Sequence, residues 1–353
     1  HSATSRGDRA PLFSEKNLRF LMIQRAAIIG TGSFGTALAH LIGGSLDEVL
    51  MVGRDPAVIS GINTNHHNPR YVTQSKLPNS VRATTDFAAV TDFPLILFCV
   101  PTSATRQTAE RLAETGLRPD AALLSCAKGI ERGTGERMSS IIHKSFPEHQ
   151  VAVISGPNHA EEIATNLATC AVIGCTNEAL ACELQALFTA PNFRSYTSDD
   201  LAGIELGGAI KNVYAIAAGI TSGLGLGDNA IAALVTRALA EMTRLGVQLG
   251  GRVETFAGLS GVGDLIATCF SPHSRNHRVG LALGQGQSLQ EAVDSLGMVA
   301  EGVPNTQSIH EAARAVGART PIIDAVFSVL YEGKPAGHAL KELLQRDPRP
   351  ETD

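Results

Sequence analysis

The fold class of this chain follows from residues 25–39, which read Arg25-Ala-Ala-Ile-Ile-Gly30-Thr-Gly32-Ser-Phe-Gly35-Thr-Ala-Leu-Ala39. The apolar run at its start predicts a short buried strand, and G-x-G-x-x-G follows directly. Glycine-rich turns are common, so the motif has weight here because a strand precedes it and a helical pattern follows. In that context Gly30 makes the turn, Gly32 lets the backbone approach a pyrophosphate, and Gly35 lets the helix pack on the strand. We therefore expect a dinucleotide to bind at this loop.

Further apolar runs extend this first unit into a sheet. They are nearly continuous, as expected for parallel strands that helices cover on both faces. The runs are 48–52, 95–100, 121–125, 151–154 and 169–173. Helical stretches alternate with them, for example 34–42 and 104–115. This alternation predicts a Rossmann-type, doubly wound parallel sheet.

The pattern changes after Asp200, because no convincing strand follows it. Helical patterns occupy 201–222, 229–249, 277–284, 288–297, 306–316 and 321–332. The length of 353 residues is enough for two domains. We therefore expect a dinucleotide-binding Rossmann domain at 22–200 and a helical substrate-binding and catalytic domain at 201–353. Residues 1–21 are polar and patternless, which indicates a tag or a disordered extension before Met22.

Composition excludes several classes of protein. The net charge of −5 argues against general nucleic-acid binding, so an anionic substrate needs a local positive site. The six cysteines lie mostly among apolar residues without a C-x-x-C pair, which predicts reduced thiols in a cytoplasmic protein. The histidines have no metal-ligand spacing, so we expect no metal site. The longest apolar stretch is rich in glycine and contains a charge, so we also expect no stable membrane insertion.

That charge belongs to Lys211, the single charged residue between Leu206 and Gly227. The surrounding Ala/Gly-rich run predicts a buried helix, and a buried ammonium shifts its pKa or finds a partner. Lys211 is therefore a candidate for proton chemistry. Two alternatives remain at this point: its side chain reaches solvent, or it pairs with Glu205 or another acid.

The end of the second strand bears on the choice of dinucleotide. An NAD site usually has an acidic residue at this strand tip, where it binds the ribose 2′-hydroxyl. Here Arg54 occupies that region and Asp55 follows it. An arginine suits a 2′-phosphate, so we expect NADP or NAD with NADPH preferred. The alternative is a surface ion pair between Arg54 and Asp55.

Further motifs follow strands or lie in the helical half. They are Ser125-Cys-Ala-Lys128-Gly-Ile-Glu131, Ser155-Gly156-Pro-Asn158-His-Ala160, Glu205-Leu-Gly-Gly-Ala-Ile-Lys211-Asn212, Gly261-Val-Gly-Asp264-Leu and Ser274-Arg275-Asn276-His-Arg278. Together they closely resemble the bacterial NAD(P)-dependent glycerol-3-phosphate dehydrogenases, from about residue 22 to about residue 333. The lysine–asparagine helix and the S-R-N-x-R sequence are the most specific of these motifs.

The resemblance implies a role for each matching residue. Lys211 matches the lysine that donates and accepts the proton, and Lys128 matches a second catalytic lysine that contacts both substrate and cofactor. The other implied substrate contacts are Gly156, Asn158, Asp264, Ser274, Arg275 and Asn276. The implied cofactor contacts, besides the glycines of the loop, are Ser33, Phe34, Arg54, Lys128, Ala160, Arg275, Val299 and Glu301. Asn158 departs from the family, because many members have Ser or Thr there, and His159 replaces a frequent Phe.

The resemblance also implies a reaction. It is the reversible reduction of dihydroxyacetone phosphate, a small-molecule phosphate, to sn-glycerol 3-phosphate for phospholipid synthesis. A lysine ammonium beside the ketone oxygen stabilises the developing alkoxide and donates its proton. Arginine and asparagine suit a phosphate dianion, because arginine donates two parallel hydrogen bonds. The apolar helices of the C-terminal half favour a homodimer.

Other interpretations remain open. Asp264 alone fits a helix N-cap, residues 274–278 fit a solvated basic loop, and Glu301 fits a surface helix position. A related hydroxyacid or 6-phosphogluconate-type dehydrogenase is an alternative enzyme. A dinucleotide-sensing protein without catalysis is an alternative of another class, but it does not need Lys211, Lys128 and Asp264 together.

Overall fold

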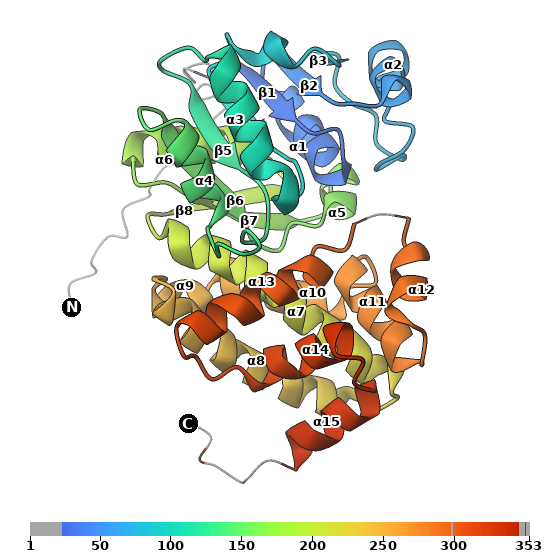
Figure 1. The fold of residues 1–353 in the computed structure, drawn as a ribbon. Coiled ribbons are helices and arrows are strands. Elements are labelled where there is room, and N and C mark those ends of the chain that lie inside the picture. The colour runs from blue at the N-terminus through green and yellow to red at the C-terminus, as the bar shows by residue number, and fades with distance from the viewer. Residues whose placement is uncertain (1–22, 298, 346–349, 351–353) are drawn as a thin grey trace, which may run out of the picture.

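A computed structural model of the chain describes residues 23–297, 299–345 and 350. A sheet with its covering helices forms one half of the molecule, and a cluster of helices forms the other half (Figure 1). The extension predicted at residues 1–21 lies outside the described residues.

Within the described residues, eight strands form one sheet in the order β3-β2-β1-β4-β5-β6-β7-β8. Their bounds are β1 Arg25–Ile29, β2 Glu48–Val52, β3 Val81–Thr84, β4 Leu95–Phe98, β5 Ala122–Ser125, β6 Gln150–Ser155, β7 Thr169–Gly174 and β8 Phe193–Ser198. The predicted doubly wound fold is confirmed. The strands β3 and β8 were missed, because each is a sheet edge with alternating buried and exposed residues and no apolar run.

One strand pair departs from the predicted parallel sheet. β6 and β7 are antiparallel, with Val153 opposite Gly174 and Ser155 opposite Val172. A parallel connection needs a crossover long enough to return along the sheet. The segment between these strands contains only α5 (Ala160–Ala164), which is too short for that return. The longer α6 (Glu178–Phe188) does return the chain, so β7 and β8 are again parallel.

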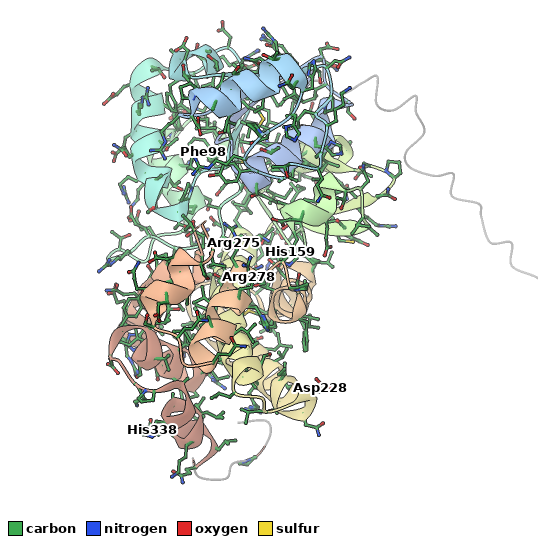
Figure 2. The ribbon with its side chains drawn as sticks, turned by 90° about the vertical axis from the view of Figure 1, so that its right-hand side faces the viewer. Phe98, His159, Asp228, Arg275, Arg278 and His338 are labelled. Atoms are coloured by element: carbon green, nitrogen blue, oxygen red, sulfur yellow. The ribbon has the colours of Figure 1, made fainter. Side chains whose placement is uncertain are left out.

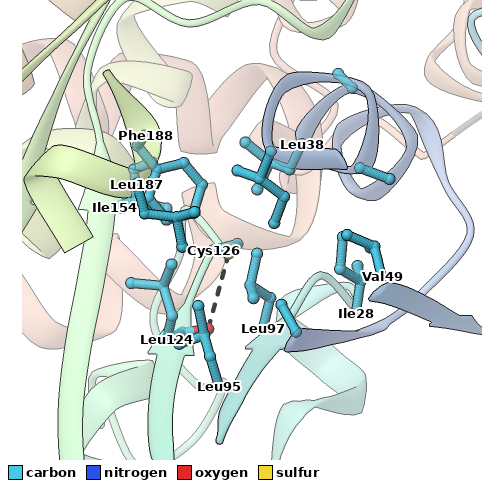
Figure 3. Close-up of a cluster of buried hydrophobic side chains, with 14 of the residues drawn as sticks. Ile28, Leu38, Val49, Leu95, Leu97, Leu124, Cys126, Ile154, Leu187 and Phe188 are labelled. Atoms are coloured by element: carbon cyan, nitrogen blue, oxygen red, sulfur yellow. Dashed lines mark hydrogen bonds between the residues drawn. The ribbon is translucent and has the colours of Figure 1, made fainter. Parts of the chain in front are cut away.

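Helices cover both faces of the sheet because alternate strand residues are apolar on both sides. One face packs against α1 (Ser33–Gly43), α5 and α6, and Figure 3 shows this cluster around Leu97 and Phe188. The other face packs against α3 (Thr105–Thr115) and α4 (Met138–Ser145). Each fully buried Leu, Ile or Phe side chain stabilises the fold by about 1.5–3 kcal/mol. Besides these helices, α2 is Pro56–Asn65, and the short 3-10 turns are η2 (Phe87–Val90) and η3 (Thr102–Ala104).

The second half of the described chain contains helices and no strand. Its elements are α7 Leu201–Gly223, α8 Asp228–Gln248, α9 Val253–Phe256, the π-turn η4 Leu259–Gly263, α10 Asp264–Phe270, α11 Arg275–Gly284, α12 Leu289–Asp294, α13 Gly302–Ala315, α14 Pro321–Tyr331 and α15 Ala336–Leu344. The absence of strands here agrees with the prediction. The sequence patterns missed α9, α10 and α15 and started α11 and α13 too late. The domain division near residue 200 stays a prediction, although β8 ends and α7 begins there.

The helix α7 is the centre of this half, and every residue from Gly203 to Thr221 is buried. Small residues let α11 pack backbone to backbone against it. A Cβ atom on Gly280 would lie 2.0 Å from the carbonyl oxygen of Ile216. This close contact fixes the start of α11, and with it Arg275, relative to Lys211 on α7.

Residues 253–270 are apolar and long enough, by composition alone, to count as a candidate membrane span. In the structure they form three short elements, α9, η4 and α10, rather than one helix. They also contain Asp264, whose carboxylate forms ion pairs with two lysines. This segment is therefore part of the helical half.

Candidate active site

A cavity of about 400 Å³ lies between the carboxyl ends of β1, β4, β5 and β6 and the helices α7, α10 and α11. Figure 2 places Arg275 and His159 at this junction of the two halves. Most of the residues predicted to contact substrate or cofactor line it. They are Gly32, Ser33, Phe34, Lys128, Asn158, Ala160, Lys211, Ser274, Arg275, Asn276, Val299 and Glu301.

Five predicted residues do not line the cavity. Gly30 packs against the backbone of Cys99, and Gly35 packs against the backbone of Gly30. Gly156 accepts a hydrogen bond from Lys128 through its carbonyl oxygen. Asp264 is buried behind the two lysines and is 1% exposed. Arg54 lies on the surface after β2.

The glycine loop has the form that a pyrophosphate requires. Gly30 has a φ of +118°, and a Cβ there would lie 2.3 Å from the carbonyl oxygen of Cys99. No atom lies within 4 Å of a Cβ placed on Gly32, so this side of the turn is open. The first N–H groups of a helix have no partner within it, and no side chain caps α1 and no acid lies in its first turn. These residues fit a dinucleotide, with the pyrophosphate at the N-terminus of α1.

Lys211 lies on α7 with its ammonium at the cavity wall, and the whole residue is 3% exposed. Its Nζ donates to Asp264 Oδ1 at 2.5 Å and to Thr268 Oγ1 at 2.5 Å. An ammonium has three N–H donors, so one remains for a ligand in the cavity. The alternative that Lys211 pairs with an acid is confirmed, but that acid is Asp264. It is not Glu205, whose carboxylate accepts hydrogen bonds from Arg137 and Ser139. The side chain also does not reach bulk solvent.

Burial sets the acidity of Lys211. Removal from water disfavours the ammonium, and the positive charge of Lys128 adds to this effect. The Asp264 carboxylate acts in the opposite direction but does not outweigh burial. The pKa of Lys211 is lowered to about 8. A group with this pKa exchanges a proton readily near neutral pH.

Asp264 joins the two lysines. Its Oδ1 accepts from Lys211, and its Oδ2 accepts from Lys128 Nζ at 2.9 Å. Burial alone would raise the pKa of this carboxyl, but the two ammonium groups outweigh burial and lower it. Asp264 therefore stays ionised. It begins α10 but does not cap it, since Gly263 is the N-cap, so the helix-cap interpretation is wrong.

Lys128 uses all three of its donors on protein oxygen atoms. Besides Asp264, its Nζ donates to the carbonyl oxygen of Gly156 at 2.9 Å and to Asn158 Oδ1 at 2.7 Å. This leaves the Nδ2 of Asn158 buried at the cavity wall without a hydrogen-bond partner among the described residues. A buried amide without a partner costs free energy. Asn158 Nδ2 is therefore better placed than the Lys128 ammonium to donate a hydrogen bond to a ligand oxygen.

Sequence reasoning missed Thr268. It lies one helical turn after Asp264 on α10, and its hydroxyl donates to the backbone oxygen of Asp264 at 2.6 Å. Its Oγ1 is thus oriented to accept from Lys211. The i, i+4 spacing from Asp264 was a usable signal, but α10 itself had not been recognised.

Asparagine side chains, also missed in part, tie the elements of the site together. Asn212, next to Lys211, donates to the carbonyl oxygen of Lys128 at 3.2 Å and accepts from Asn276 at 2.9 Å. Asn276 accepts in turn from the N–H of Gly302 at 2.9 Å, and Asn305 donates to the same Lys128 oxygen at 2.8 Å. These bonds connect the Lys128 loop, α7, α11 and α13. Asn212 carried a signal, since it is a polar residue beside Lys211 in a buried helix.

The residues from Ser274 to Arg278 are a helix start rather than a solvated loop. Ser274 caps α11 by accepting from the N–H of His277 at 3.2 Å. Arg275 Nη1 donates to the carbonyl oxygen of Val299 at 2.6 Å. The N-terminus of α11, Arg275 and Asn276 therefore face the cavity together and suit an anion.

Two further titratable groups line the cavity. Burial, with the positive charges of Lys211 and Lys128, lowers the pKa of His159 to about 4, so its imidazole is neutral at neutral pH. Burial raises the pKa of Glu301, whose carboxylate accepts from the N–H of Thr102 at 3.3 Å. Glu301 is thus an inward-facing residue at the start of α13, and the surface-helix interpretation is wrong.

Arg54 and Asp55 do not form the alternative surface pair. Asp55 caps α2 by accepting from the N–H of Ala57 at 2.9 Å, and it pairs with Arg70 at 3.3 Å. Arg54 is exposed at the tip of β2, beyond the glycine loop. Asp55 is therefore bound to other groups, and Arg54 is the exposed cation beside it.

Comparison with known proteins identifies the family. The model of the NAD-dependent glycerol-3-phosphate dehydrogenase N-terminus matches residues 25–181, and that of the C-terminus matches residues 200–341. The chain belongs to this family. It is an oxidoreductase family that uses NAD or NADP, so the resemblance found in the sequence is confirmed.

Individual relatives match over nearly their whole length. A glycerol-3-phosphate dehydrogenase (NAD(P)+) of Enterococcus faecalis is 43% identical over 336 residues, which are 94% of this chain and 98% of the relative. One from Streptomyces griseus is 46% identical over 332 residues, which are 93% and 98% of the two chains. The crystal structure of a glycerol-3-phosphate dehydrogenase from Coxiella burnetii has a TM-score of 0.86 at 35% identity and covers 92% of this chain and 99% of its own. The similarity therefore includes both halves and the junction between them.

Proposed function

We propose that this protein reversibly reduces dihydroxyacetone phosphate to sn-glycerol 3-phosphate with NADPH or NADH. The observation that carries the proposal is Lys211, a buried ammonium at the cavity wall with two donors used and one free. Its pKa of about 8 suits a group that gives a proton to an alkoxide. We also propose that residues 22–200 bind the dinucleotide and residues 201–353 supply the acid and the phosphate site.

The residues of the cavity divide the work of this reaction. The loop after β1 would hold the dinucleotide, which when bound in its reduced form would supply a hydride to the ketone carbon. Lys211 then stabilises the negative charge that develops on the ketone oxygen and donates its proton there. Asp264 keeps that ammonium in place, and the nearby positive charge of Lys128 makes its proton easier to release. In the reverse direction the neutral amine of Lys211 accepts the proton.

We propose that the substrate phosphate binds at the N-terminus of α11. Arg275 supplies a charged donor there, and the first N–H groups of the helix supply neutral ones. Asn276 positions α11, because both polar atoms of its amide bind protein groups. Asn158 Nδ2 is left to donate to a substrate oxygen on the other side of the ketone.

Steady-state kinetics with dihydroxyacetone phosphate and each reduced dinucleotide test this function directly. We expect turnover with both dinucleotides and no turnover with simple hydroxyacids in the oxidative direction. Oxidation of a hydroxyacid without turnover of dihydroxyacetone phosphate would favour the related dehydrogenase. Dinucleotide binding without turnover of any ketone phosphate would instead support a sensing protein.

The position of Arg54 predicts the choice of dinucleotide. Arg54→Ala is expected to raise the KM for NADPH about tenfold, the effect of losing about 1.4 kcal/mol from a charge-assisted contact. The KM for NADH should change little, because NADH has no 2′-phosphate. Arg82→Ala, at an exposed arginine that pairs with Glu48, is the control. Equal losses for the two dinucleotides would show that Arg54 does not bind the 2′-phosphate.

We further propose a homodimer in the cytoplasm. The first half of α8 supports association, because Ala232 and Ala233 are exposed there and Ile231 is only partly buried, while Leu234 and Val235 pack against the helical core. Equilibrium sedimentation measures the mass directly, and twice 37.0 kDa is the expected result. In a cell the product would supply the glycerol phosphate unit of phospholipids.

A further inference from the structure

Two cysteines lie next to each other in the wall of the dinucleotide cavity. Cys99 follows β4 and Cys126 follows β5, and the last register pair of these parallel strands is Phe98 with Ser125. The backbone continues this pairing by one step, since the N–H of Cys126 donates to the carbonyl oxygen of Phe98 at 3.1 Å. Cys99 is therefore directly opposite Cys126.

Both side chains point to the same face of the sheet. Alternate residues of a strand share a face, and Leu97 and Leu124 belong to the cluster that contains Cys126 (Figure 3). Cys99 packs against that same cluster. Neighbouring strands lie about 4.8 Å apart, and disulfides join Cα atoms about 4.4–6.8 Å apart. Burial, together with the adjacent Cys99 thiol, raises the pKa of Cys126.

The pair also lies where a dinucleotide would cover it. Both cysteines line the cavity. A Cβ on Gly35 would lie 3.3 Å from Cys99 Cβ, so Cys99 lies directly beneath the first turn of α1. Cys99 is partly exposed, whereas Cys126 is 5% exposed. A small oxidant in the cavity therefore reaches Cys99 first.

We propose that a hydroperoxide converts Cys99 and Cys126 to a reversible disulfide and that a bound dinucleotide prevents this oxidation. The shielding rests on the proposed function, because it requires the dinucleotide to occupy this cavity. The disulfide itself rests only on the positions of the two thiols. The two cysteines would thus form the disulfide mainly in protein whose cavity holds no dinucleotide when the oxidant is present.

The chemistry balances in two steps. The thiolate of Cys99 attacks one peroxide oxygen, an S–O bond forms, the O–O bond breaks, and hydroxide or an alkoxide leaves. Sulfur is oxidised to the sulfenic acid, and the peroxide is reduced. Cys126 then loses its proton and attacks the Cys99 sulfur, an S–S bond forms, and the S–O bond breaks with loss of water. A dithiol reductant restores both thiols by exchange.

Peptide mapping of the full chain tests the proposal. The protein is treated with hydrogen peroxide with and without NADP+, catalase stops the reaction, and N-ethylmaleimide blocks the remaining thiols under denaturing conditions. We expect a peptide pair joined through Cys99 and Cys126 that dithiothreitol separates. NADP+ at 100 times its Kd lowers the unliganded fraction to about one hundredth, so the disulfide should form up to about 100-fold more slowly.

Variants separate this site from the other cysteines. Cys182→Ser, at the exposed cysteine of α6, should form the disulfide at the wild-type rate. Cys99→Ser should form none, and Cys126→Ser should leave a sulfenic acid at Cys99 that dimedone labels. Recovery of Cys126 as a maleimide adduct after Cys99 has been oxidised would overturn the proposal.

The two hypotheses fail in different ways. Turnover of dihydroxyacetone phosphate without the disulfide would reject the cysteine pair and leave the proposed function standing. A disulfide that forms equally fast with NADP+, in an enzyme that turns over, would reject the shielding. The same lack of protection in a protein without any turnover would reject the proposed dinucleotide site.

Discussion

Lys211→Ala is expected to lower kcat for reduction of dihydroxyacetone phosphate by about two to four orders of magnitude, the usual contribution of a general acid. The substitution removes the donor beside the ketone oxygen but leaves the glycine loop intact, so NADPH binding should be nearly unchanged. Lys211→Met, which fills the same space, separates loss of the proton donor from creation of a cavity. Lys334→Met, at a partly exposed lysine that pairs with Glu342, is the matched control. A wild-type kcat in either Lys211 variant would reject the acid role.

The pH profile gives a second measurement of the same prediction. Reduction needs the ammonium, whose pKa is about 8, so kcat/KM for reduction should fall about tenfold per unit above that pH. Oxidation needs the neutral amine, so its rate should rise with pH up to about 8. Lys128→Met removes a positive charge that lowers this pKa, so the fall of kcat/KM for reduction should begin at a higher pH. If kcat/KM for reduction still falls above pH 8 in Lys211→Ala, the pH dependence comes from another titratable group.

The sequence predicted the part of the fold that depends on local patterns. Buried parallel strands are apolar throughout, and the Ala/Gly-rich run of α7 indicated a buried helix. The edge strand β8 was missed because half of its residues face solvent, as in Arg194 and Tyr196. The reversal at β7 was missed because strand direction depends on the connection before it, whose only helix, α5, is too short to return the chain along the sheet, and no pattern within β7 shows this.

The site was predictable as a set of residues but not as a set of contacts. Lys211 was identifiable as a charge in an apolar helix. Its partners Asp264 and Thr268 lie 53 and 57 residues further along the chain. The π-turn before Asp264 brings them to α7, because a Cβ on Gly207 would lie 2.4 Å from the carbonyl oxygen of Ser260. Such a backbone contact between distant segments leaves no periodic signal in the sequence. For the same reason, the sequence could not show that all three N–H donors of Lys128 are used within the protein.

Asp264→Asn is expected to lower the free energy of unfolding by about 3–5 kcal/mol, the usual cost of removing one partner of a buried ion pair. The carboxylate is buried between two ammonium groups, and an amide cannot neutralise either of them. Urea unfolding at pH 7 measures the change. Asp324→Asn, at a partly exposed acid that pairs with Arg314, should cost less than about 1 kcal/mol.

The same variant tests how the site sets the acidity of Lys211. Asp264 is the group that raises the pKa of Lys211 against burial, so its loss should move the limb for reduction below pH 8. Lys128→Met in the Asp264→Asn background removes one of the two unpaired charges. It should recover part of the lost stability, because repulsion between the lysines disappears. For the same reason, the pH above which kcat/KM for reduction falls should rise again. An unchanged limb in Asp264→Asn would mean that burial alone, and not this carboxylate, determines when Lys211 releases its proton.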